Sequence, residues 1–383
     1  MIYIGEKLRS LRKEKGMTLK EVAGEEFTKG YLSQIELGKV TPSFKVLTHL
    51  AAQLKVDLAH LIGTDNQLDY QLARLETLFA AKKYKGVLID SQQISTDWQS
   101  PVGVKVKLLQ AKALFYLNRL SECSRLLQQL ITIDRDWISP CKLEAFAFGG
   151  LALFGQQCYV KAIEIYEQGI AFAEAKGIKQ PLTLSKMYLN KATAWQNLEQ
   201  YETAIIEYNQ TLAYARHHQI METVLDVFIR LGYCHFKKEN LEQAKEYLEK
   251  GLQLNRILEL ELPQAEALLL LSLVYFAENN YQLAEEYGDQ AHKLLTGLSR
   301  TEPLSKNSLL EALVILTKIY LATDRHRQAK KTLQNLITQA EKSTDLPPVT
   351  AKNIAHLCMA MGKNQAANLF FARIVNLATE LKK

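Results

Sequence analysis

The sequence predicts an all-α protein in two parts, a small N-terminal helical domain followed by a long array of helical hairpins. The chain of 383 residues is 48% apolar and has only 18 glycines and 8 prolines, which is typical of helix-rich globular proteins. Short apolar segments with helical spacing fill the first 64 residues. From residue 68 to the end, similar segments recur at intervals of about 40 residues, so the larger part is predicted to be a repeat.

The N-terminal part is predicted to contain five short helices. Leu8 and Leu11 follow the period of a first helix, which Gly16 ends as a C-terminal glycine cap. Thr18, followed three residues later by Glu21, is the pattern of a capping box and predicts the start of a second helix.

A third helix is predicted over 29–37, with Thr28 as its N-cap and Gly38 as its end. A fourth begins after residue 43, and a fifth begins at Asp57. Five helices within about 60 residues define a small domain with its own core.

This layout resembles the lambda-repressor-like, Cro-type helix-turn-helix family. The resemblance spans residues 3–64, and its most specific part is the segment YLSQIELGKVTPS. Between Ala23 and Tyr31 the turn is one residue shorter than the usual pattern and lacks its turn glycine. Glu36 is assigned to structure, as a partner of a nearby basic group.

The resemblance implies that the third helix packs its apolar face against the second helix and places its polar face in the major groove of DNA. Glycine permits close approach, glutamine can pair with adenine, and lysine can reach guanine or phosphate. The predicted reading face consists of Thr28, Lys29, Gly30, Ser33 and Gln34. The residues predicted to contact phosphates are Arg9, Lys20, Lys39, Thr41 and Lys45.

Charge is consistent with a polyanionic partner without requiring one. The net charge is +6, and the first 64 residues hold ten Lys/Arg against seven Asp/Glu. The alternatives are a solvated charged face and a helix-turn-helix domain that contacts protein.

In the repeat, a helix end, a polar turn and a second helix recur in fixed register. The second helix carries a small residue near its start, at successive spacings of 39, 42, 40, 40 and 45 residues. We call these residues anchors: Cys123, Ala162, Ala204, Ala244, Ala284 and Ala329. Weaker copies place an anchor at Val87 and at Ala366. Twelve residues before each anchor lies another mostly small residue, where two helices must cross closely: Ala111, Gly150, Ala192, Gly232, Ser272 and Thr317.

Prolines support the same boundaries, because proline is tolerated where a helix starts and breaks helix interiors. They precede the first helix of a unit at Pro101, Pro140, Pro181, Pro263, Pro303 and the pair Pro347-Pro348. The pattern resembles the tetratricopeptide repeat and covers residues 68–383 in about eight units. The resemblance implies a right-handed solenoid whose first helices line a concave surface.

That concave surface is predicted to bind a short peptide. The repeat register points polar side chains inward from two neighbouring units, where asparagine and glutamine can hold a peptide backbone and a cation can hold a carboxylate. The predicted peptide-binding residues are Lys186, Asn190, Gln196, Asn197, Arg230, Tyr233, Phe236 and Lys237. For each of them the alternative is a solvated helix face or a packing aromatic.

The sequence lacks the common catalytic and metal-binding motifs. The sequence contains none of the phosphate-loop, dinucleotide, zinc-protease or nucleophile-elbow motifs, and its five cysteines form no C-x-x-C pair. We therefore expect no enzyme activity, no metal and no cofactor. The charged N-terminus and the lack of a long apolar run predict a cytoplasmic protein without a membrane partner.

The whole chain, in domain order and length, resembles the RRNPP family of intracellular peptide-pheromone receptors. The resemblance implies a homodimeric transcription regulator whose binding to a DNA operator changes when a short signalling peptide enters the repeats. It also implies that Asn190, with Asn197 and Arg230 beside it, holds the peptide backbone. Two alternatives remain: a scaffold that acts mainly by binding a partner protein, and an enzyme such as a phosphatase.

Overall fold

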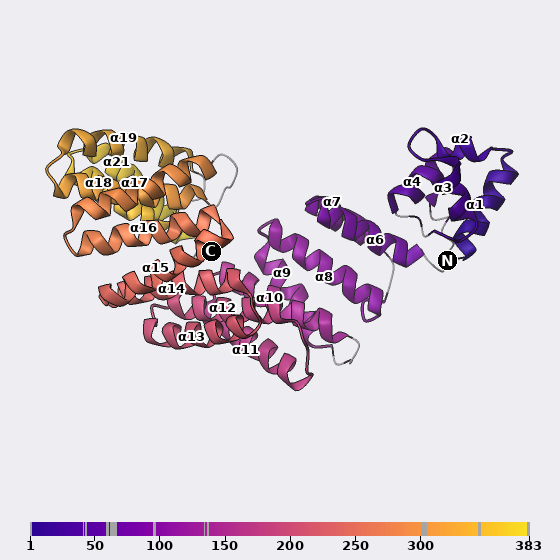
Figure 1. The fold of residues 1–383 in the computed structure, drawn as a ribbon, viewed down its shortest axis with the longest axis horizontal. Helices are drawn as coiled ribbons and strands as arrows, with labels where there is room; N and C mark the ends of the chain where they lie inside the picture. Colours follow the sequence, from indigo (N-terminus) through magenta and orange to yellow (C-terminus); the bar gives the residue numbers. More distant parts are fainter. Residues whose placement is uncertain are drawn as a thin grey trace. The chain divides into compact units, whose positions relative to one another are not determined.

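The computed structural model is built from helices alone throughout the residues that it describes (Figure 1). These are residues 2–40, 42, 44–58, 61, 67–94, 97–133, 135, 138–299, 305–343 and 346–380. Within them, no helix combines the length and apolarity that crossing a bilayer requires. The all-α prediction is confirmed.

The N-terminal domain contains α1 (Ile2–Glu14), α2 (Leu19–Ala23), α3 (Lys29–Glu36) and α4 (Phe44–Gln53). Leu8, Leu32 and Leu50 are at most 1% exposed and meet in one core. Of the fifth predicted helix, Leu58 and Leu61 are helical and belong to the same core, and the residues around them lie outside the described part.

The predicted caps of α2 and α3 are confirmed. The Thr18 hydroxyl accepts from the backbone N–H of Glu21, while the Glu21 carboxylate accepts from the backbone N–H of Thr18 at 2.6 Å. The Thr28 hydroxyl accepts from the backbone N–H of Tyr31 at 3.2 Å. The expectation that the turn lacks a glycine was wrong, because Gly24 ends α2 with φ of +64°. This left-handed conformation favours glycine and lets the chain leave α2 within one residue.

Arg12 and Glu36 form a largely buried ion pair between α1 and α3. Arg12 Nε and Nη2 donate to the two carboxylate oxygens of Glu36 at 2.6 and 2.8 Å, and Nη1 donates to the carbonyl of Met17. The Glu36 hydrogen bond, opposed by partial burial, raises the pKa of Arg12. The structural role predicted for Glu36 is thereby confirmed.

The remaining described helices pair in sequence order into eight antiparallel hairpins. Each hairpin has a first and a second helix, and the first helices of several successive hairpins also contact one another. The hairpins are α6 (Gln67–Ala80) with α7 (Tyr84–Gln92), α8 (Pro101–Tyr116) with α9 (Leu120–Ile131), α10 (Ser139–Gly155) with α11 (Tyr159–Ala175), α12 (Pro181–Asn197) with α13 (Tyr201–His217), α14 (Met221–Lys237) with α15 (Leu241–Leu258), α16 (Glu261–Ala277) with α17 (Tyr281–Leu298), α18 (Ser305–Ala322) with α19 (His326–Lys342), and α20 (Pro348–Ala360) with α21 (Asn364–Glu380).

The anchors are the points where the two helices of a hairpin cross. All six anchors and Val87 are fully buried, and the Ser272 hydroxyl donates to the carbonyl of the anchor Ala284 at 2.6 Å. A Cβ at Gly150 would lie 2.3 Å from the Tyr166 ring, so the small residues twelve positions before the anchors are required by contact. In the last hairpin the anchor is Ala367, which is 1% exposed, and not the predicted Ala366.

A left-handed residue recurs five positions before every anchor, in the turn that joins the two helices. It lets the first helix end and the second begin after a turn of constant length. In seven of these turns the residue is not glycine: Lys82, Asn118, Gln157, Glu199, Glu239, Asn279 and Asp324, with φ between 55° and 61°. In the last hairpin it is Gly362, which confirms Ala367 as the anchor there.

The prolines lie at helix starts as predicted. Pro101, Pro181 and Pro348 open α8, α12 and α20, Pro140 is the second residue of α10, and Pro263 falls in the first turn of α16. Pro303 lies outside the described residues.

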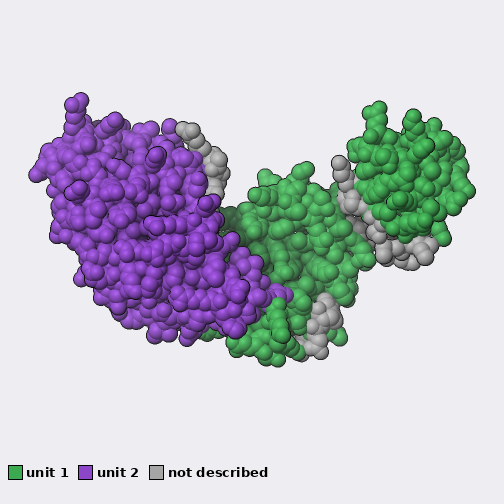
Figure 2. All heavy atoms as spheres, viewed as in Figure 1, with its two compact units in different colours: residues 1–179 green, residues 180–383 purple. Residues whose placement is uncertain are grey.

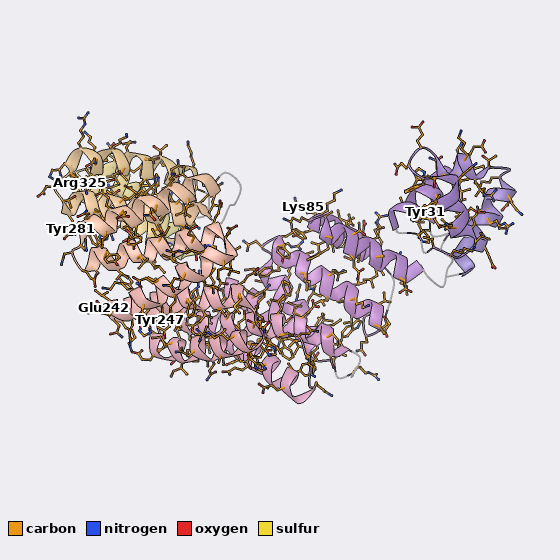
Figure 3. The ribbon with its side chains drawn as sticks, in the orientation of Figure 1. Tyr31, Lys85, Glu242, Tyr247, Tyr281 and Arg325 are labelled. Atoms are coloured by element: carbon orange, nitrogen blue, oxygen red, sulfur yellow. The ribbon has the colours of Figure 1, made fainter. Side chains whose placement is uncertain are left out.

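The chain divides into two compact units, residues 1–179 and residues 180–383 (Figure 2). The first contains the N-terminal domain and three hairpins, and the second contains five hairpins. Ion pairs tie neighbouring hairpins of the second unit: Lys245 pairs with Glu278 at 2.8 Å, and Arg325, marked in Figure 3, pairs with Glu285 at 2.7 Å. The boundary predicted between residues 64 and 68 stays a prediction.

Candidate functional site

The outer face of α3 presents polar side chains to solvent. Lys29, Gly30 and Gln34 are exposed and Ser33 is partly exposed, while Leu32 and Ile35 on the opposite face are buried. Thr28 is exposed but already serves as the N-cap. The helix therefore offers a continuous polar surface that its own core does not use.

The flanking positions agree in part with the predicted phosphate contacts. Arg9, Lys20 and Lys39 are exposed. Thr41 lies outside the described residues, and Lys45 lies in α4 with its side chain outside them. Leu37, which the sequence reading missed, is 58% exposed at the C-terminal end of α3.

A cavity of about 250 Å³ lies in the second unit, between the first helices α12, α14, α16 and α18. Its apolar lining consists of Ile229, Leu269 and Leu270. Its polar lining consists of Gln196, Arg230, Tyr233, Glu266, Ser308 and Glu311. Every lining residue belongs to a first helix, so the cavity lies on the face for which peptide binding was predicted.

Three of the eight predicted peptide-binding residues line this cavity. Gln196 is oriented by Tyr208, whose hydroxyl donates to the Gln196 amide oxygen at 2.8 Å. Burial raises the pKa of Tyr233 to about 12, so its hydroxyl stays protonated and can donate. Arg230 completes this group.

The other five predicted residues do not line the cavity. Asn197 donates to the carbonyl of Thr193 in its own helix, and Phe236 packs against a core cluster. The Lys237 ammonium lies 5.5 Å from the centre of the Tyr233 ring. Lys186 is exposed, and Asn190 is partly buried at the position of α12 that corresponds to Arg230 in α14.

Carboxylates dominate the charge around the cavity. Burial raises the pKa of Asp226 to about 6; Arg230 lowers it, and Glu266 and Glu222 raise it further. The pKa of Glu311 is also raised, by burial and by Glu266. Protein atoms surround these carboxylates and remove part of their hydration, so their charged form is disfavoured even where some of the side chain reaches water.

Glu266 and Glu311 line the cavity but were not predicted from the sequence, although the repeat register contains the signal. Each lies six residues before the small residue of its first helix, as Asp226 does before Gly232. Applying the same repeat positions to the next two hairpins would have identified Glu266 and Glu311.

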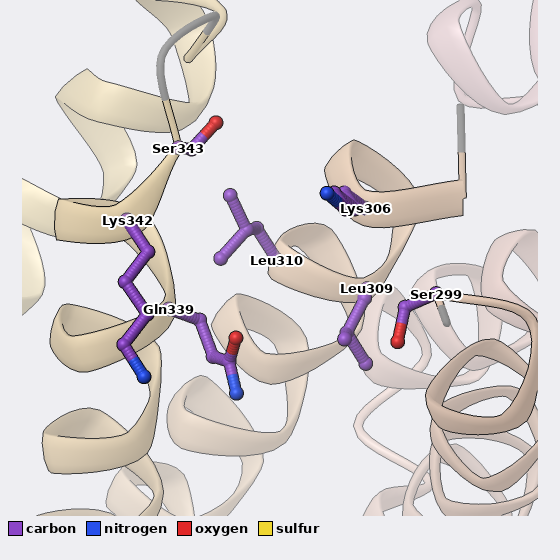
Figure 4. Close-up of a pocket in the computed structure, with 7 residues that line it drawn as sticks. All are labelled: Ser299, Lys306, Leu309, Leu310, Gln339, Lys342 and Ser343. Atoms are coloured by element: carbon purple, nitrogen blue, oxygen red, sulfur yellow. The ribbon is translucent and has the colours of Figure 1, made fainter. Parts of the chain in front are cut away.

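A second cavity, of about 190 Å³, opens at the ends of α18 and α19 (Figure 4). Lys306, Leu309 and Leu310 line it from α18, and Gln339 and Lys342 line it from α19. It contains no residue predicted to bind peptide or DNA.

Comparison with known families supports both parts of the chain. Residues 5–65 match the helix-turn-helix domain family, and residues 223–296 and 311–343 match two tetratricopeptide repeat families. The chain is therefore a helix-turn-helix protein with tetratricopeptide repeats. These two families are typically regulators or scaffolds and not enzymes. The search of curated proteins found no match.

Solved structures with a similar fold include quorum sensors, a phosphatase and a signal transduction ATPase with a tetratricopeptide repeat sensor. The apo form of the quorum sensor NprR from B. thuringiensis is 14% identical, with a TM-score of 0.53 over 84% of this chain and 100% of that chain. NprR in complex with its cognate peptide NprX is 16% identical, with a TM-score of 0.56 over 81% and 87%. Aspartyl phosphate phosphatase F from Bacillus subtilis is 13% identical, with a TM-score of 0.57 over 90% and 96%.

NprR is a member of the RRNPP family. The resemblance of the sequence to that family is thus confirmed in domain composition and in fold. At these identities the likeness concerns the fold alone.

Proposed function

We propose that this chain is a cytoplasmic, homodimeric transcription regulator whose operator binding is controlled by a short signalling peptide held between the first helices of its repeats. One observation carries the proposal: a single chain combines a helix-turn-helix domain with an exposed polar α3 face and a repeat face that contains a mixed polar and apolar cavity. NprR, which shares the fold, is a quorum sensor that was solved with a peptide.

The DNA-binding half of the proposal rests on α3. An exposed helix of this kind enters the major groove with its N-terminal residues against the base edges. Gln34 can pair bidentately with adenine and Lys29 can reach guanine, while Arg9, Lys20 and Lys39 are free of the domain core and can hold phosphates. In a homodimer, two such helices would have to lie about 34 Å apart, or a multiple of this, to reach successive major grooves.

The regulatory half rests on the repeats. A peptide changes DNA affinity only if it binds two conformations of the protein unequally. A coupling free energy of about 1 to 3 kcal/mol changes the affinity about 5- to 150-fold. Stacked hairpins suit this role, because small rotations between neighbours add up along the array.

The DNA-binding half is tested by selecting duplexes from a random pool with the full-length protein. Replacing Lys29 or Gln34 with alanine should weaken binding of the selected duplex by about 1 to 3 kcal/mol, because each change removes a base contact. Lys85→Ala is the matched control, since Lys85 is an exposed lysine of α7 (Figure 3). Equal affinities of wild type and both variants would show that α3 does not read the operator, and failure to enrich any duplex would reject DNA binding.

The regulatory half is tested with heptapeptides selected by the full-length protein from a random library. A selected peptide should change the affinity for the selected duplex, and Asn190→Ala should abolish this response without changing the affinity measured in the absence of peptide. Asn209→Ala is the matched control, because Asn209 is an exposed asparagine of the second helix α13. A full response in the Asn190 variant would remove this residue from the peptide site.

A further inference from the structure

The cavity between the first helices contains two carboxylates that have no counterion among the described residues. Glu266 on α16 and Glu311 on α18 both line it, and neither forms a hydrogen bond or an ion pair with any described residue. Their repeat-equivalent positions place them on neighbouring first helices, which contact each other. The two side chains therefore face the same space with the same charge.

Several other carboxylates of this unit have basic partners. Glu207 pairs with Lys191 at 2.8 Å, and Glu278 and Glu285 have basic partners in neighbouring hairpins. Arg230 is the cationic residue among those that line the cavity, and it lowers the pKa of Asp226. Glu266 and Glu311 differ from these paired carboxylates, because no ion pair with a described residue neutralises them.

The rest of the cavity lining determines which kind of ligand side chain fits. Ile229, Leu269 and Leu270 supply an apolar wall beside the carboxylates. The volume of about 250 Å³ is below the roughly 300–1,000 Å³ of pockets that enclose whole small molecules. Such a cavity fits one long side chain of a larger ligand. The side chain would have an apolar stem and a charged end.

We propose that the peptide bound by this groove carries a lysine or arginine whose stem packs on Leu269 and Leu270 and whose cation lies between Glu266 and Glu311. The inference rests on the proposed peptide-binding function and adds the chemistry of one peptide position.

Electrostatics explains why the cavity would select a basic side chain at this peptide position. In the free protein the two carboxylates repel each other in a partly desolvated space, and burial together with Glu266 already raises the pKa of Glu311. A cation removes this repulsion and makes charge-assisted hydrogen bonds. A neutral or acidic side chain would bury the carboxylates without partners, so it is rejected.

The test uses the full-length protein and a random heptapeptide library, followed by sequencing of the bound peptides. Wild type should enrich lysine or arginine at one position. The charge-reversed variant Glu266→Lys with Glu311→Lys should enrich aspartate or glutamate at that position. The isosteric variant Glu266→Gln with Glu311→Gln should bind the most enriched peptide about 10- to 100-fold more weakly, because hydrogen bonds to charged groups are lost.

Glu249→Gln on the second helix α15 is the matched control and should leave this affinity unchanged. If the charge-reversed variant does not fold, the isosteric variant decides the question alone. Enriched peptides without a basic position, or unchanged affinity in the isosteric variant, would overturn the inference and leave the peptide-binding function standing. If wild type enriches no peptide, the basic peptide position and the peptide-binding function are both overturned.

Discussion

Replacing Arg12 with methionine should lower the free energy of unfolding of the N-terminal domain by about 3 to 5 kcal/mol, the usual cost of breaking a buried ion pair. Glu36 is only 7% exposed and takes two hydrogen bonds from Arg12. Without Arg12, this carboxylate stays buried and unpaired. Hydrogen exchange of the α3 amides measures the loss, because it reports local unfolding. DNA binding should fail in parallel, since α3 carries the predicted reading face.

Two controls separate lost charge from lost packing. The double variant Arg12→Met with Glu36→Leu should recover most of the stability, because apolar residues can replace a buried ion pair at little cost. Arg119→Met removes the partner of Glu122 in an exposed pair and should leave exchange in its helix unchanged. A double variant as unstable as the single one would show that the ion pair is not the source of the loss.

Replacing Asp226 with asparagine should stabilise the second unit at neutral pH and not at pH 4. The pKa of Asp226 is raised to about 6 in the folded protein, against about 4 in an unfolded chain. The folded state therefore binds the proton more tightly, and Asp226 reduces stability increasingly as the pH rises from 4 through 6. The difference is worth up to about 3 kcal/mol at pH 7.5.

Urea unfolding of both proteins at pH 4, 6 and 7.5 measures this effect. The stability gain of the variant over wild type should be near zero at pH 4 and largest at pH 7.5, and the pH 4 value serves as the internal control. Glu311, whose pKa is also raised, remains in both proteins and so cancels in the comparison. A gain that is the same at every pH would mean that the charge of Asp226 does not control stability.

The hairpin array was predictable because its signals are local. Small residues at Ala204, Ala244 and Ala284 repeat with the period of the fold, since a close helix crossing excludes a large side chain at each. Thr18 and Glu21 likewise predicted their helix start, because a capping box is made within four residues. The error at Ala366 arose where the last copy is weakest.

The lining of the cavity between the first helices was predicted less fully, because it depends on which side chains converge. The inward register identified Gln196, Arg230 and Tyr233 as cavity-lining residues, whereas Phe236 packs against a core cluster and does not line the cavity. Glu266 and Glu311 became visible as a pair only once α16 and α18 were placed side by side.

By itself the sequence determined the helical class, the number of hairpins, their register and the polar face of α3, because each follows from spacing along one helix or one turn. The tertiary structure alone decided which residues adopt the left-handed conformation and which carboxylates share a cavity. Glu199 and Glu239 have φ near +60° without being glycine. This left-handed conformation is imposed by the fold, because the free energy gained when both helices of a hairpin pack outweighs a local backbone cost of about 1 to 2 kcal/mol.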